Sequence, residues 1–268
     1  MSTSMGRVHV LEAKGEGRGP PLVMLHGLSS AGVHFMPMLR PLHAAFSRII
    51  LPDLPGHGFS EPPRILEMPG FHDAMLEALD RIVDEPAIVL GNSLGGYAAI
   101  RYARERPYRV RGLFLASPAG AAMTEEELET LRSLFRMNHH ADAVAFVDRL
   151  LSRSSWIRHP IAWGLRRQLR RPEVNAILRI ASTEHLLTPE DLARLDMPTL
   201  LYWGKDERIL PERSLEFFKR HLPPHARVEE PEGLGHAPFL DAPLTFAQRL
   251  VRFGEEVVAG MTAAPSQA

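Results

Sequence analysis

The heptapeptide LGNSLGG, residues 90–96, decides how this chain folds. The apolar run AIVL precedes it at residues 87–90, and YAAIRYA, which has helical spacing, follows at residues 97–103. A short apolar run bounded by turn residues is typical of a buried strand. We therefore expect Ser93 in a sharp turn between a strand and a helix. Gly91 and Gly95 fit such a turn, because a side chain there would collide with neighbouring backbone.

Strand and helix patterns alternate on both sides of this turn. Apolar runs predict strands at residues 7–11, 22–25, 47–51, 87–90, 112–116, 198–203 and 226–229. Apolar residues at helical spacing predict helices at residues 71–83, 95–106, 211–221 and 243–258. This alternation indicates an α/β fold, with a mostly parallel central sheet flanked by helices on both faces.

Between residues 121 and 196 the alternation stops and only helical patterns remain. Thr124, with Glu127 three positions later, predicts a capping box at the start of the first of these helices. Others are expected at residues 141–151, 156–169 and 173–181, and Pro189 opens a short one. We therefore predict a core of residues 1–120 and 197–261, an all-helical insertion at residues 121–196, and a disordered tail at residues 262–268.

Composition excludes several function classes. The 268 residues carry a formal net charge of −1 and contain no cysteine. A chain of this charge is not built to bind nucleic acid, and it offers no disulfide or thiolate metal site. The first 17 residues lack the apolar region of a signal peptide. We expect a cytoplasmic protein without cofactor, metal or nucleic-acid partner, and the sequence does not define its oligomeric state.

The stretch around Ser93 also predicts chemistry, because it matches the pattern G-x-S-x-G between a strand and a helix. A serine hydroxyl is a weak nucleophile and needs a base. His236 lies between the last predicted strand and the last helix, where it can reach the carboxyl edge of the sheet. The loop GKDERILP, residues 204–211, offers two acids that could orient this histidine, Asp206 and Glu207. The backbone N–H groups of Leu28 and Leu94 are candidates for an oxyanion hole.

Five segments together resemble the α/β-hydrolase superfamily along residues 8–258. They are VMLHGLSSAG, LPDLPGHGFS, GNSLGG, WGKDERILP and GLGHAPFLDAP, in that order. The resemblance implies the α/β-hydrolase fold, with residues 121–196 as a helical cap over Ser93. In the family the acid commonly follows the glycine by three positions, which is Glu207 here, although aspartate is usual there. Glu207 is therefore favoured as the acid, with Asp206 as the alternate.

The same resemblance implies that His26, His57 and Asp53 shape turns and do not transfer protons. Ser60 is expected to be a turn or cap residue. The predicted function is a cofactor-independent serine hydrolase that cleaves a carboxylic ester with an apolar part through an acyl-enzyme. One alternative is a hydrolase of carbon–carbon bonds in ring-fission products, whose elbow often reads G-N-S-x-G-G. Another is a catalytically silent binding module on the same fold.

Two features of the predicted cap bear on partners. Candidate pocket-wall residues are Trp156, Trp163, Phe135, Met137, Phe146 and Leu150. The segment from residue 149 to residue 171 contains no acid and seven arginines, Arg149, Arg153, Arg158, Arg166, Arg167, Arg170 and Arg171. We interpret this segment as a solvated basic face, and as an alternative it contacts an anionic lipid surface or an acidic substrate weakly.

Overall fold

A seven-stranded sheet forms the centre of the computed structural model, which describes residues 1–4, 6–153 and 156–263. The strands lie in the order β3-β5-β4-β6-β7-β8-β9. Their bounds are β3 (Val10–Lys14), β4 (Leu22–Leu25), β5 (Arg48–Pro52), β6 (Ala87–Ser93), β7 (Val110–Pro118), β8 (Thr199–Tyr202) and β9 (Arg227–Glu229). Among the described strands of this sheet, only β3 pairs antiparallel, with β5 at one edge. The predicted mostly parallel sheet is confirmed.

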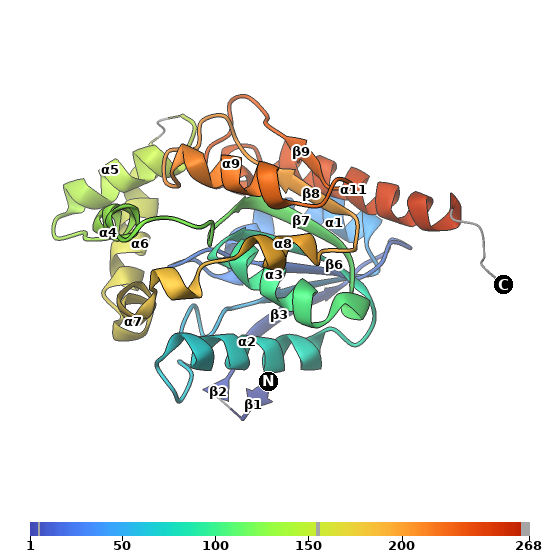
Figure 1. The fold of residues 1–268 in the computed structure, drawn as a ribbon, viewed down its shortest axis with the longest axis horizontal. Coiled ribbons are helices and arrows are strands. Elements are labelled where there is room, and N and C mark those ends of the chain that lie inside the picture. Colours follow the sequence, from blue (N-terminus) through green and yellow to red (C-terminus); the bar gives the residue numbers. More distant parts are fainter. Residues whose placement is uncertain (5, 154–155, 264–268) are drawn as a thin grey trace.

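Helices cover both faces of this sheet (Figure 1). One face carries α2 (Met68–Ile82), α3 (Leu94–Glu105), α8 (Pro189–Ala193) and α9 (Glu212–His221). The other carries η1 (Gly32–Met38), α1 (Leu39–Ala45), α10 (Pro238–Asp241) and α11 (Pro243–Ala263). All four residues of β4 are buried, which a strand covered on both faces requires. No helix of the described residues is both long and apolar enough to cross a bilayer.

The structure corrects the prediction for the amino-terminal segment. Instead of one strand at residues 7–11, β2 (Gly6–Arg7) pairs with β1 (Ser2–Thr3) in a separate two-stranded sheet. The chain joins the central sheet only at Val10, where β3 begins to pair with β5. The sequence analysis also missed α1, because LRPLHAA contains a proline and lacks a side-chain cap at its start.

The segment between β7 and β8 is helical. It contains α4 (Glu125–Leu134), α5 (His140–Leu150), α6 (Arg158–Leu169), α7 (Pro172–Ile180), η3 (Thr183–His185) and α8. The capping box of Thr124 and Glu127 is present. Helices α4–α7 gather at one end of the sheet (Figure 1), and we call them the cap. Of the predicted tail, residues 264–268 lie outside the described residues, whereas residues 262 and 263 end α11.

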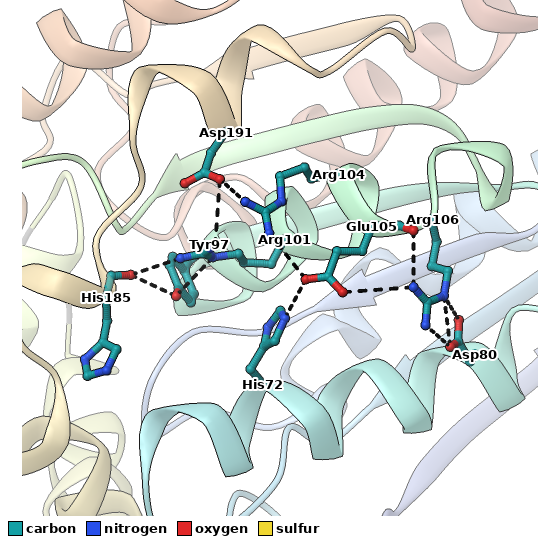
Figure 2. Close-up of polar contacts among 9 residues, drawn as sticks. All are labelled: His72, Asp80, Tyr97, Arg101, Arg104, Glu105, Arg106, His185 and Asp191. Carbon is teal, nitrogen blue, oxygen red and sulfur yellow. Dashed lines mark hydrogen bonds and ion pairs between the residues drawn. The ribbon is translucent and has the colours of Figure 1, made fainter.

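The chain that returns from the cap is bound to α3, the helix that begins beside Ser93. The Tyr97 hydroxyl donates to the backbone carbonyl of His185 at 2.9 Å. Arg104 and Arg101 both pair with Asp191 of α8, as Figure 2 shows. Burial raises the pKa of Asp191, but the Thr188 amide and the two arginines outweigh burial, and the net pKa is lowered. Asp191 therefore stays ionised at neutral pH and holds α8 against α3.

The far end of α3 is bound to α2. Glu105 accepts from His72 at 2.7 Å, and Arg106 pairs with Asp80 at 2.8 Å (Figure 2). Helix α3 is thus tied to α2 on one side and to α8 on the other. Ser93, which immediately precedes α3, is therefore attached to a helix that contacts both of its neighbours.

Candidate active site

Ser93 occupies a strained turn at the end of β6. Its φ of 54° lies in the left-handed region, which non-glycine residues rarely adopt. The turn brings α3 close to β4, because a Cβ on Gly95 would lie 2.1 Å from the carbonyl oxygen of Leu25. The strand–turn–helix geometry predicted from G-x-S-x-G is therefore present.

His236 and Glu207 form a buried pair. His236 Nδ1–H donates to Glu207 Oε2 at 2.7 Å, and the two side chains are 6% and 4% exposed. The other carboxylate oxygen of Glu207 accepts from the backbone N–H of Ile209 at 2.7 Å and of Leu210 at 3.0 Å. These bonds fix the carboxylate and use Nδ1 of the ring, so that Nε2 of His236 has no hydrogen-bond partner among the described residues.

The electrostatics of Glu207 follow from the same contacts. Burial raises the pKa of its carboxyl, because an ionised group loses hydration. The charge and hydrogen bond of His236 and the amides of Ile209 and Leu210 lower it more, and the net pKa lies below the usual value. An ionised carboxylate beside a histidine favours the tautomer with its proton on Nδ1.

Asp206 takes no part in this pair. Its backbone N–H donates to the carbonyl of Leu234 at 3.0 Å. Among the described residues, its side chain makes no hydrogen bond with His236. Of the two acids that the sequence offers, the structure brings Glu207 to the histidine.

Ser93 and His236 line one cavity of about 390 Å³ beneath the cap. Its core side includes Leu28, and its cap side includes Phe146 and Ile161. A volume of this order suits a small organic ligand. The cavity therefore places the serine and the histidine against the same bound molecule.

A second cavity of about 120 Å³ also reaches Ser93. Ser93, Leu28 and Phe135 line both cavities, whereas His236 lines only the larger one. Most of the smaller cavity is aliphatic, with Leu94 and Leu131 among its walls. The serine thus lies where the larger cavity meets the smaller aliphatic one.

The two candidate oxyanion donors lie beside this junction. Leu94 is the first residue of α3, so its N–H has no partner within the helix. The N–H of Leu28 makes no hydrogen bond to any described residue, and Ser29 after it has a φ of 59°. Both groups are free to donate to a ligand.

Three residues that hold the loops of His236 and Glu207 were missed by sequence analysis. The Asn92 side chain donates to the carbonyls of Ala116 and His236, at 3.0 and 2.9 Å. Asp241 accepts from the N–H of Gly235 at 2.7 Å, and Arg208 donates to the carbonyl of Leu151. For Asn92 the signal was its place next to the serine, but the partner carbonyls follow only from the fold.

His26, His57 and Asp53 have structural contacts, and the His57 ring bonds the carbonyl of Pro55 at 3.0 Å through Nδ1. The two ring nitrogens of His26 bond the carbonyl of Gly27 and the N–H of Leu54, at 2.8 and 2.9 Å. Asp53 accepts from the N–H of Gly32 at 2.7 Å and of Phe59 at 3.0 Å. Ser60 donates to the carbonyl of Asp53 at 2.7 Å. These contacts agree with the turn-shaping roles that the resemblance implied.

The structure divides the predicted pocket-wall residues. Phe135, Phe146 and Leu150 line the larger cavity. The prediction is wrong for Trp156 and Trp163, which are 79% and 63% exposed. Met137 packs against the cap interior and also lines a third cavity. Trp163 points outward because Ile161, Ala162 and Leu165 occupy the inner face of α6. Trp156 lies in the turn that precedes this helix.

The arginine-rich segment is not one uniform basic face. Arg158 pairs with Asp148, and Arg171 donates to the carbonyl of Gly58. Arg167 lies over the ring of Trp163, 5.9 Å from its centroid. Several of the seven arginines are therefore used inside the protein, and only the remainder can meet a partner.

Comparison with known proteins agrees with this geometry. The model of the alpha/beta hydrolase family matches residues 22–249. A pimeloyl-[acyl-carrier protein] methyl ester esterase of Nitrosomonas europaea is 30% identical over 264 residues, which cover 90% of this chain and 97% of that protein. The enzyme of the same name from Xanthomonas oryzae pv. oryzae is 32% identical, covering 88% and 96%. The solved N-acyl homoserine lactonase AidH is 28% identical with a TM-score of 0.73, covering 96% and 97%.

The buried histidines predict a loss of stability in acid. Burial lowers the pKa of His26 to about 4 and that of His57 to about 3, whereas both take up protons near pH 6.5 when unfolded. Their stabilisation is complete above that pH and is lost as the pH falls from about 6.5 towards 4. His26 alone accounts for about 3 kcal/mol of this loss by pH 4.

Thermal unfolding measured from pH 8 to pH 4 tests this expectation. His26→Gln should lower the melting temperature at pH 8 and flatten its decline below about pH 6.5. Exposed His140 provides the control, His140→Gln, which should follow the wild-type curve. A decline equally steep in wild type and His26→Gln would contradict the assignment.

Proposed function

This chain belongs to the alpha/beta hydrolase family, and we propose that it is a serine hydrolase that cleaves carboxylic esters. The observation that carries the proposal is the buried 2.7 Å hydrogen bond between His236 and Glu207, in the wall of the cavity that Ser93 also lines. Ester substrates are supported by the relatives, two of which are named as methyl ester esterases.

In the proposed reaction, Ser93 Oγ attacks the ester carbonyl carbon while His236 Nε2 takes the serine proton. Glu207 holds the imidazole in the required tautomer and stabilises its positive charge. The N–H groups of Leu28 and Leu94 stabilise the oxyanion. His236 then gives its proton to the leaving alcohol, which produces an acyl-enzyme. Water, deprotonated by His236, releases the acid and restores Ser93.

The two cavities predict how the ester lies. The leaving oxygen must be next to His236, since it receives the histidine proton. His236 lines only the larger cavity, so this cavity takes the alcohol part. The acyl part then enters the smaller aliphatic cavity beside Leu94 and Leu131. We therefore propose an ester with an apolar acyl chain as the substrate class.

Hydrolysis of p-nitrophenyl esters, from acetate to decanoate, tests the proposed function. Wild type should turn over esters, and Ser93→Ala should lower kcat by at least about a thousandfold, because the nucleophile is lost. Ser30 lines the same cavity, and Ser30→Ala is the matched control, expected to stay within about threefold. Activity that survives Ser93→Ala, or no ester hydrolysis by wild type, contradicts the proposal. In the second case, ring-fission products are the next substrates to assay.

The identity of the acid is tested by a pair of neighbouring substitutions. Glu207→Gln should lower kcat about a thousandfold or more, because an amide cannot stabilise the histidine cation. Asp206→Asn should leave kcat within about threefold, since that side chain does not contact His236. Steady-state kinetics on the best p-nitrophenyl ester measures both. The reverse ranking would assign the role to Asp206.

The orientation of the ester is tested by narrowing each cavity separately. Leu131→Phe should lower kcat/KM for decanoate about tenfold relative to acetate, because the acyl space is shortened. Gly164 lines only the larger cavity, and a Cβ there meets no atom within 4 Å. Gly164→Leu should therefore leave the preference among acyl chains unchanged. It should lower kcat/KM for naphthyl acetate relative to ethyl acetate. If Leu131→Phe instead changed the preference for the alcohol and Gly164→Leu the preference for the acyl chain, the ester would lie in the opposite orientation.

A further inference from the structure

A third cavity, of about 670 Å³, lies in the cap between α4, α6 and α7. Five arginines line it, namely Arg132, Arg136, Arg166, Arg170 and Arg179. Glu129 is the single carboxylate among its described lining residues. We call it the arginine cavity. Neither Ser93 nor His236 lines it, so it is separate from the candidate active site.

Two of the five arginines are occupied within the protein. Arg132 donates to the carbonyls of Leu178, at 3.1 Å, and of Ala181, and also contacts Glu129. Arg136 pairs with the same glutamate. The one carboxylate of the cavity is therefore already shared by two guanidinium groups.

The other three arginines have donors to spare. Arg166 donates to the carbonyl of Asn138 at 2.7 Å, but its Nε is buried and has no hydrogen-bond partner among the described residues. The side chains of Arg170 and Arg179 make no hydrogen bond or ion pair with any described residue. A buried N–H without a partner is costly, and guanidinium groups stay charged at every physiological pH. An anion in the cavity would relieve both the unmet hydrogen bond and the charge repulsion.

The shape of the site selects the kind of anion. The three available arginines line one concave space, in which Arg170 and Arg179 are exposed to solvent, and such a space fits a small anion. Guanidinium groups bind phosphate oxygens through paired N–H donors. Glu125, outside the cavity lining, also pairs with Arg132 at 3.0 Å. Five arginines against the two carboxylates of Glu125 and Glu129 still call for a ligand with more than one negative charge. A phosphate monoester or a pyrophosphate has this chemistry.

We propose that the arginine cavity binds a dianionic phosphate group. Phe135 lines this cavity as well as both cavities at Ser93, and Arg132 lines both the arginine cavity and the smaller aliphatic one. A phosphate bound here therefore lies next to the proposed acyl space. It is either a free phosphate compound or the far end of an ester substrate, and the two share the same recognition.

Binding of pyrophosphate, measured by calorimetry and by thermal shift at constant ionic strength, tests the proposal without any ester. Pyrophosphate should bind saturably to the wild-type protein and raise its melting temperature. The double variant Arg166→Gln/Arg170→Gln should bind at least about tenfold more weakly, because two phosphate-facing donors are lost. Arg149→Gln/Arg153→Gln removes the same charge from exposed positions outside the cavity and is the matched control, expected to bind as wild type.

The outcomes separate the arginine cavity from general charge attraction. Lack of saturable binding, or equal weakening in both double variants, overturns the proposal. Melting curves without ligand show whether each variant is folded, so that unfolding is not mistaken for lost binding. Because no ester is used, these results do not depend on whether Ser93 is the nucleophile.

A second arm distinguishes the two sources of phosphate. Methyl esters of fatty acids that end in a phosphate are compared with the same esters that end in a hydroxyl. If the phosphate belongs to the substrate, Arg166→Gln/Arg170→Gln should raise KM about tenfold for the phosphate-ended ester only. If pyrophosphate binding is weakened but both esters are hydrolysed as by wild type, the site takes a free phosphate compound.

Discussion

The backbone of Ser93, held at a φ of 54°, is the constraint on which the rest of this site depends. An L residue in this region is strained, so surrounding contacts must hold it there. Gly95 allows α3 to approach the carbonyl oxygen of Leu25 closely, and α3 is itself tied to α2 and α8 (Figure 2). The strain at one residue is thus sustained by a helix that is bound along its length. The serine hydroxyl is lifted from the sheet as a consequence.

The acid shows how the structure decides between sequence neighbours. Asp206 and Glu207 are adjacent, and the sequence gives only a spacing argument for choosing between them. In the folded chain, Glu207 is oriented by the amides of Ile209 and Leu210, whose bonds also help keep its pKa low. The longer side chain reaches His236 from there. The positions of these two amides in the loop therefore allow a glutamate to take the place of the usual aspartate.

Much of the fold followed from local patterns. The apolar run at residues 22–25 coincides with β4, and Thr124 caps α4 as expected, because both signals are local. The strand expected at residues 7–11 was wrong because pairing with β1 is not encoded in the run itself. The outward position of Trp163 was missed because periodicity does not say which face of a helix is covered. Asn92 was missed because its partners are backbone carbonyls that only the fold brings near.

One side chain of the cap lines all three cavities described above. Phe135 lines both cavities at Ser93 and the arginine cavity. Its position depends on the end of α4, where Arg132 bonds the carbonyls of Leu178 and Ala181 and so fastens α4 to the chain after α7. Residues of the core supply the proposed chemistry, and residues of the cap supply the walls. Substrate choice can therefore differ between relatives that share the same serine, histidine and acid, because the cap can change without moving the elbow.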